Sequence, residues 1–227
     1  MIHAQGVTVG RGRNVLMTEL DLEIGAGELV HVAGPNGCGK SSLLRVLAGV
    51  VEPRRGRVTR DAPCAFVPER VALPGGMRAG RWLRLSGAQD APVPPGLDRA
   101  CGSLSKGELQ KVALAGALDA ARTRPLLLAL DEPWAGLDPD AREDLGEQLA
   151  AAAARGSAVV FTDHTRAATI HATRTINLGG RMPAHAPAAV RISLARDGER
   201  DAVVVREPQL AARLADGWEI SDAEALP

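Results

Sequence analysis

The stretch that most constrains this chain is GPNGCGKSS at Gly34–Ser42, which matches the pattern G-x-x-x-x-G-K-[ST]. It follows the apolar run Leu29–Ala33 and precedes Ser41–Ala48, where leucines recur at helical spacing. Glycines let backbone N–H groups curl around phosphates, and the positive end of a helix adds to the attraction. The pattern therefore predicts a strand, a phosphate-binding loop and a helix.

Each residue of this loop is a candidate contact for a nucleotide. Lys40 is expected to reach the β- and γ-phosphates, and Ser41 to offer its hydroxyl to Mg²⁺. The nucleotide-binding candidates are Gly34, Pro35, Asn36, Gly37, Cys38, Gly39, Lys40, Ser41 and Ser42.

A second buried strand is expected at Leu126–Leu130, and two adjacent carboxylates, Asp131 and Glu132, follow it directly. Nucleotides bind at the carboxyl edge of the strands in open α/β sheets. Asp131 is expected to hold Mg²⁺ through water. Glu132 is expected to be the general base, because a neutral attacking water needs a positioned proton acceptor.

The remaining pattern predicts how these pieces are joined. Val7–Ile24 alternates apolar and polar residues around a break at Gly10–Asn14, as an antiparallel ribbon does. A third buried strand is expected at Ala158–Phe161, and a helix should begin after Asp138 and end near Gly156. A strand, a helix and a further strand in this order predict a parallel crossover.

Two composition shifts predict the domain organisation. Residues from about 70 to 124 contain clusters of Pro and Gly and two helical patterns, Ala79–Leu85 and Leu109–Ala121, which predicts a helical subdomain inserted into the α/β core. Residues 1–181 then form the main domain, and residues 182–227 a small ββα appendage with room for a final strand. Its helix is expected at Gln209–Ala215. Covering a sheet edge is the favoured role for this appendage over regulation or dimerisation.

Composition excludes several classes of partner. The chain has 27 basic and 27 acidic residues, so no net field favours nucleic acid. No apolar run approaches the roughly 20 residues that span a bilayer, so a membrane partner must be another protein. The N-terminus carries no secretory pattern, and Cys38, Cys64 and Cys101 form no CxxC pair. We therefore expect free thiols in the cytoplasm.

Four motifs in order, GPNGCGKSS, LSKGE, LDEPWAGLD and FTDHT, closely resemble those of the ATP-binding cassette (ABC) ATPases, and the resemblance covers about Val7–Gly180. It implies an α/β P-loop fold with a mixed sheet core, an antiparallel β subdomain and the inserted helical subdomain. It also implies ATP and Mg²⁺ as cofactors.

The resemblance implies further site residues. LSKGE looks like the family's signature loop, so that Ser105 and Gly107 of one chain would face the γ-phosphate bound by a second chain. Asp138 matches the D-loop aspartate, and His164 resembles the switch histidine that contacts the γ-phosphate. Taken alone, Ser105 and Asp138 are also good helix N-caps, and both roles can hold together.

The chain departs from the family pattern around the nucleotide. Glu69 stands where a glutamine is usual; it can still reach Mg²⁺ through water, but it adds negative charge beside the triphosphate. Arg11 or Arg13 stands where an aromatic ring usually stacks on adenine, and a planar guanidinium can stack instead. In LSKGE, Lys106 and Glu108 replace the common glycine and glutamine.

The resemblance implies a motor subunit of an ABC transporter, located peripherally on the inner face of the cell membrane. Its partners would be a polytopic membrane subunit and a second ATP-binding cassette, identical or different, that dimerises head to tail with it when ATP binds. The alternatives are a soluble cassette ATPase outside transport and a nucleotide-dependent regulator of low turnover, which the change at Glu69 would permit.

Overall fold

The computed structural model describes residues 1–88, 91–163, 172–178, 189–196, 199–205 and 219–226, with side chains described up to residue 178. The chain divides into two compact units, Met1–Arg181 and Met182–Pro227. Each unit is described by itself.

The core of the first unit is a five-stranded sheet in the order β5-β6-β7-β3-β8, and each described pair of neighbours is parallel. The strands of its centre are almost wholly apolar, as expected where helices cover both faces. The bounds are β3 Leu29–Ala33, β5 Cys64–Val67, β6 Leu127–Asp131, β7 Ala158–Thr162 and β8 Arg174–Asn177.

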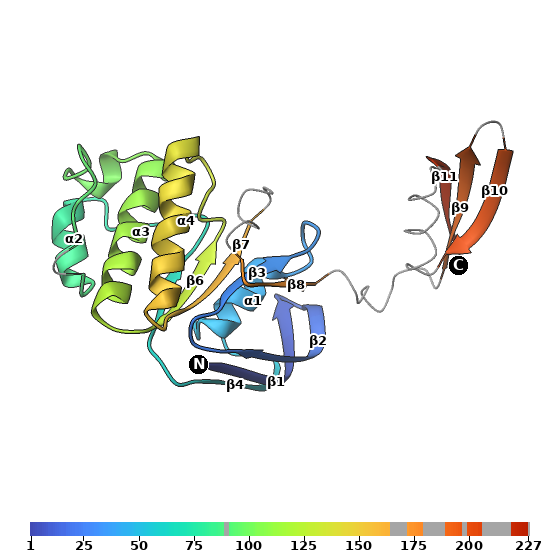
Figure 1. Cartoon of the computed structure of the whole chain (residues 1–227), viewed down its shortest axis with the longest axis horizontal. Helices are drawn as coiled ribbons and strands as arrows, with labels where there is room; N and C mark the ends of the chain where they lie inside the picture. The colour runs from blue at the N-terminus through green and yellow to red at the C-terminus, as the bar shows by residue number, and fades with distance from the viewer. Residues whose placement is uncertain (89–90, 164–171, 179–188, 197–198, 206–218, 227) are drawn as a thin grey trace. The chain divides into compact units, whose positions relative to one another are not determined.

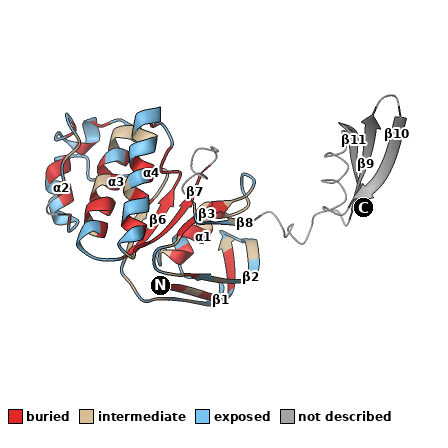
Figure 2. Cartoon of the chain, viewed as in Figure 1, coloured by how far each residue is buried: buried red, intermediate tan, exposed pale blue. Residues whose placement is uncertain are grey.

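Alternate residues of each strand pack on opposite faces of this sheet. Helices α3 (Lys106–Thr123) and α4 (Pro139–Ala154) lie side by side on one face, where they bury Leu128 and Leu130 of β6 (Figures 1 and 2). Helix α1 (Lys40–Leu47) covers the other face, which includes Leu127 and Ala129. The parallel crossover predicted between the second and third buried strands is confirmed, with α4 as its helix.

A second sheet, β2-β1-β4, is antiparallel and packs on the α1 side. Its strands are β1 Ile2–Arg11, β2 Asn14–Ile24 and β4 Arg55–Arg60. The expected ribbon is present, and it turns at the predicted glycine-rich break. The sequence predicts a mixed sheet core. In the structure the described strands of the core sheet pair in parallel, and the antiparallel strands form this second sheet.

The inserted helical region contains α2 (Ala79–Leu85), with the bounds that the sequence predicts, a 3-10 turn at Cys101–Ser103 and α3. Its own apolar cluster includes Leu83, Leu97 and Val112. Helix α3 begins three residues before the predicted Leu109, because Ser105 and Glu108 form a capping box. Its first turn therefore includes the LSKGE loop.

The second unit is an antiparallel sheet in the order β10-β9-β11. The strands are β9 Ala189–Arg196, β10 Glu199–Val205 and β11 Glu219–Leu226, so a final strand follows the first two. The helix predicted at Gln209–Ala215 lies outside the described residues. Among the helices that are described, none is long and apolar enough to cross a membrane.

Candidate active site

The loop between β3 and α1 depends on glycine at its two ends. At Gly34 the backbone has φ +151°, and a Cβ atom would lie 2.8 Å from Cys38 Sγ. At Gly39, the N-cap of α1, φ is +107°, and a Cβ would lie 3.0 Å from Met17 Cε and 3.1 Å from Leu16 Cβ. A side chain at either position would be strained and would collide with the chain's own atoms.

Lys40 is only 7% exposed, and its ammonium lies over this loop. Its Nζ donates to the carbonyl oxygens of Gly34 at 2.8 Å and Pro35 at 3.1 Å. The positive charge is therefore held at the N-terminus of α1, where the helix dipole also favours an anion.

Asp131 lies at the carboxyl end of β6, 3% exposed. Its Oδ1 accepts hydrogen bonds from Ser41 Oγ at 3.0 Å and Thr162 Oγ1 at 2.8 Å. A hydroxyl from the phosphate loop and a carboxylate from the neighbouring strand therefore meet at one point.

This donor set fits Mg²⁺, which takes oxygen ligands and is usually held by one or two protein groups together with substrate phosphates. Ser41 and Asp131 would hold the ion, and it would neutralise phosphate charge beside them. The described residues contain no cluster of three or more His, Cys, Asp or Glu side chains suited to a metal.

Glu132 has a left-handed backbone, with φ +54°, and is 9% exposed. Such a conformation in a residue other than glycine costs roughly 1–3 kcal/mol and persists where neighbours enforce it. Its N–H donates to Thr162 Oγ1 at 3.0 Å, and its carbonyl accepts from Gln110 Nε2 at 2.9 Å. Strand β7 and helix α3 thus hold the backbone of Glu132 at the sheet edge.

A cavity of about 570 Å³ with a mainly polar wall is lined by Lys40, Ser41 and Glu132, and Asp131 is not among its lining residues. Arg11 and Glu69, both singled out from the sequence, line it, whereas Ser105, Gly107 and Asp138 do not. The lining residues are Arg11, Asn14, Leu16, Asn36, Gly37, Gly39, Lys40, Ser41, Ser42, Glu69 and Glu132.

Glu69 is paired with a cation of the same chain. Lys106 Nζ lies 3.2 Å from Glu69 Oε1, with both side chains about half exposed. Glu69 and Lys106, which both depart from the usual family residues, therefore offset each other's charge.

Ser105 caps α3. Its Oγ accepts from the N–H of Glu108 at 3.3 Å, and its own N–H donates to Glu108 Oε2 at 2.8 Å. The Ser105 N–H first, and then the Ser105 hydroxyl and Arg99, lower the pKa of the Glu108 carboxyl. The Ser105 hydroxyl is therefore engaged with Glu108 in this chain, and it would have to turn away from that carboxylate to donate to a phosphate oxygen.

Asp138 caps α4 in the way its position before Pro139 predicts. Its Oδ1 accepts from the N–H of Ala141 at 2.9 Å, and this bond lowers the pKa of the Asp138 carboxyl. His164 lies outside the described residues, and Asp163 is the last described residue before it.

Gln110 and Thr162 support Glu132 but were not identified from the sequence. Thr162 is part of the FTDHT motif, and the parallel register places it beside Asp131. Gln110 lies within the helical pattern of α3, where nothing in the sequence distinguishes it from a surface residue.

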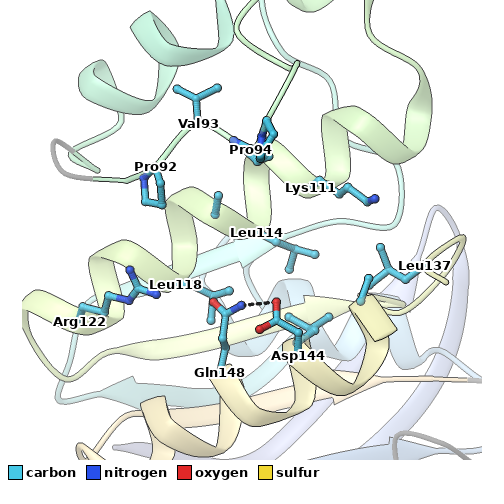
Figure 3. Close-up of a pocket in the computed structure, with 14 residues that line it drawn as sticks. Pro92, Val93, Pro94, Lys111, Leu114, Leu118, Arg122, Leu137, Asp144 and Gln148 are labelled. Carbon is cyan, nitrogen blue, oxygen red and sulfur yellow. Dashed lines mark hydrogen bonds between the residues drawn. The ribbon is translucent and has the colours of Figure 1, made fainter. Parts of the chain in front are cut away.

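A separate cavity of about 350 Å³ lies between α3, α4 and the segment Pro92–Pro95 (Figure 3). Its wall is mainly apolar, with Leu114, Leu118 and Leu137, and Gln148 donates to Asp144 at its edge. None of the site residues predicted from the sequence lines it.

A glycine-rich loop from strand to helix, with its lysine and hydroxyl, and a carboxylate pair at the next strand's edge define a P-loop nucleoside triphosphatase. A family model described as "ABC transporter" matches residues 17–73, and one described as "AAA domain, putative AbiEii toxin, Type IV TA system" matches residues 96–164.

The curated relatives narrow the class. The chain is 38% identical over 193 residues to the cytochrome c biogenesis ATP-binding export protein CcmA of Novosphingobium aromaticivorans, covering 79% of this chain and 96% of that protein. It is 38% identical over 161 residues to a zinc import ATP-binding protein, ZnuC, of Alkalilimnicola ehrlichii, covering 64% of this chain and 60% of that protein.

Solved structures agree on the fold. A dimeric post-hydrolysis ATP-binding cassette bound to ADP and Pi matches with a TM-score of 0.67 at 23% identity, covering 79% of this chain and 94% of that chain. This chain belongs to the ATP-binding cassette family of ABC transporters. The family, the fold class and the ATPase activity predicted from the sequence are confirmed.

Proposed function

We propose that this protein is the ATP-hydrolysing motor subunit of an ABC transporter, and that it works as a head-to-tail pair of cassettes on a separate polytopic membrane subunit. In this proposal, ATP closes the two cassettes, hydrolysis lets them open, and the membrane subunit converts the motion into movement of a substrate.

The observation that carries the proposal is the position of the signature loop. Ser105 is exposed and Gly107 partly so, and neither lines the cavity that contains Lys40 of the same chain. A Cβ built on Gly107 would meet no atom within 4 Å, so nothing in this chain's packing requires glycine there. A glycine at this helix end would let a second chain bring its bound triphosphate close to the N–H groups of α3.

Within each composite site the residues take distinct roles. Lys40 and the loop N–H groups bind the β- and γ-phosphates, and Ser41 and Asp131 hold Mg²⁺. Glu132 accepts the proton of the attacking water, His164 contacts the γ-phosphate, and Ser105 of the other chain donates its O–H. Arg11 lies on the cavity wall, where its guanidinium can stack on adenine.

The relatives support transport as the purpose of this cycle. One is named for export and the other for zinc import, and both are named as ATP-binding proteins. The ATP-binding part is thus common to relatives that differ in the direction of transport. The relatives also support a location at the inner face of the membrane through the membrane subunit, since a motor of this kind acts on such a partner.

Affinity purification from mildly solubilised membranes, followed by mass spectrometry, tests the proposal. We expect a polytopic membrane protein in stoichiometric amount, retained by the Glu132→Gln variant in MgATP. Recovery of the chain in the soluble fraction, with ATPase activity but no membrane partner, would point to the soluble cassette ATPase instead.

A further inference from the structure

We propose that His31 is a positioning residue for the Asp163 carbonyl after β7, and that it acts on hydrolysis without acting on ATP binding. This inference deepens the proposed function, because it rests on the role given there to His164. It starts from a buried imidazole that the roles described so far do not use.

His31 lies in the middle of β3, where Leu or Val would be the ordinary choice. It is 5% exposed, and it pairs in register with Phe161 on β7 and Thr175 on β8. Its Nδ1 is buried and has no hydrogen-bond partner among the described residues. An unpaired buried nitrogen reduces stability, so an imidazole here is not explained by packing.

The other ring nitrogen points to the strand end. His31 Nε2 lies 3.4 Å from the carbonyl oxygen of Asp163. A carbonyl can only accept, so Nε2 carries the proton in this contact. The distance is longer than the usual 2.7–3.2 Å, and a shift of a few tenths of an ångström would make it a normal hydrogen bond. That carbonyl belongs to Asp163, the residue that directly precedes His164 in the sequence.

The ring itself is held by two aromatic neighbours. His31 stacks on Phe161 with centroids 5.2 Å apart and planes 15° apart. Phe161 meets Trp134 edge to face at 4.9 Å, and Trp134 follows Glu132 by two residues. The three rings thus form a row: His31 from β3, Phe161 from β7 and Trp134 from the segment after β6. A donor fixed by such a row can hold the Asp163 carbonyl in a set position relative to Glu132.

The test uses the full-length protein with His31→Leu, His31→Gln, His164→Ala and the double variant His31→Leu/His164→Ala. In His31→Leu we expect kcat to fall about fivefold, as for loss of one positioned hydrogen bond, while KM for ATP stays within about twofold. His31→Gln keeps an N–H donor and should retain at least about half of kcat. Because leucine removes the unpaired nitrogen, the Tm of His31→Leu should equal or exceed that of the wild type.

A lower kcat in His31→Leu without a lower Tm would indicate positioning. A purely structural role would lower both kcat and Tm. In the His164→Ala background, His31→Leu should have no further effect on kcat, since it acts through His164. Wild-type kcat in His31→Leu, a parallel fall in kcat and Tm without rescue by Gln, or an undiminished effect in the His164→Ala background would each overturn the proposal. Wild-type turnover in His164→Ala would remove the role of His164 as well, whereas an impaired His164→Ala beside a normal His31→Leu would sink only the role of His31.

Discussion

The phosphate loop before α1 and the signature loop before α3 both present glycine, a hydroxyl and a helix N-terminus. They differ in how closely the rest of the chain packs against them. In the phosphate loop, Gly34 and Gly39 are required by the chain's own geometry, and Ser41 is bonded to Asp131. In the signature loop, Gly107 faces open space and Ser105 bonds to Glu108 of its own helix. The first loop is complete within one chain, whereas in the proposed function the second loop contacts ATP that another chain holds.

The largest effects should come from the site that one chain completes, to which the phosphate loop and Glu132 both belong. Glu132→Gln should lower turnover by about 10²–10⁴, or roughly 3–5 kcal/mol of barrier, because the general base is lost. ATP binding should persist, since the amide is nearly isosteric and removes a negative charge near the γ-phosphate. Steady-state turnover and nucleotide titration measure the two effects.

Lys40→Ala is the matched control, because loss of the ammonium should abolish binding and turnover together. Near-normal turnover in Glu132→Gln would remove the general-base role.

Alkylation of Cys38 should block the same loop by steric hindrance. Its partly exposed thiol is close enough to Gly34 that a bulky adduct would displace the loop, and MgATP should protect it. Burial raises the pKa of Cys64 to about 11, so that thiol stays protonated at neutral pH and should label slowly. Maleimide labelling with mass spectrometry follows each site, and full ATPase activity after labelling of Cys38 would contradict the expectation.

The Glu69–Lys106 pair joins the cavity wall to the signature loop, and it should have a smaller effect. Glu69→Gln should leave ATPase activity equal to the wild type or raise it, because it removes negative charge near the triphosphate. Lys106→Gln should raise KM for ATP by less than about fivefold, since exposed ion pairs contribute up to about 1 kcal/mol.

The double variant Glu69→Gln/Lys106→Gln should return KM toward the wild-type value. A large loss of turnover in Glu69→Gln with ATP affinity intact would instead show a catalytic role for Glu69.

The smallest effect concerns the cap of α3. The Ser105 N–H lowers the pKa of Glu108 below its ordinary 4.5, so the charged carboxylate stabilises the fold above that pH, and the contribution is lost as pH falls through the lower folded value. Glu108→Gln keeps the cap without titrating. The Tm advantage of the wild type over Glu108→Gln at pH 7 should shrink at about pH 3.5, and an unchanged difference would show that Glu108 does not act through this charge.

Most of the site that lies within one chain could be predicted from the sequence, because its motifs are short and local. The order of strand, Gly34–Ser42 and helix follows from periodicity, and Asp131 with Glu132 follows from a buried strand that ends in acids. The α2 bounds also follow from a local pattern.

Contacts between distant segments could not be predicted in this way. The Glu69–Lys106 pair joins residues 37 positions apart, and Gln110 reaches Glu132 across 22 positions. The His31–Phe161–Trp134 row depends on the register between β3 and β7, which no single segment encodes. The early start of α3 depends on a reciprocal bond between Ser105 and Glu108, and helix periodicity alone does not report it.

In the proposed function, Gly107 of one chain contacts ATP that the other chain holds. The mass of the Glu132→Gln variant in MgATP, measured by light scattering, tests this contact most directly. We predict a particle with the mass of two chains, where the single chain is 23.7 kDa. Adding Gly107→Asp should abolish this dimer by repulsion from the partner's triphosphate, while Tm and the ATP affinity of the monomer are retained, because an acid at a helix N-terminus is favourable by about 0.3–1 kcal/mol. A dimer that survives Gly107→Asp, or a Glu132→Gln chain that binds MgATP and stays at the mass of one chain, would contradict the account.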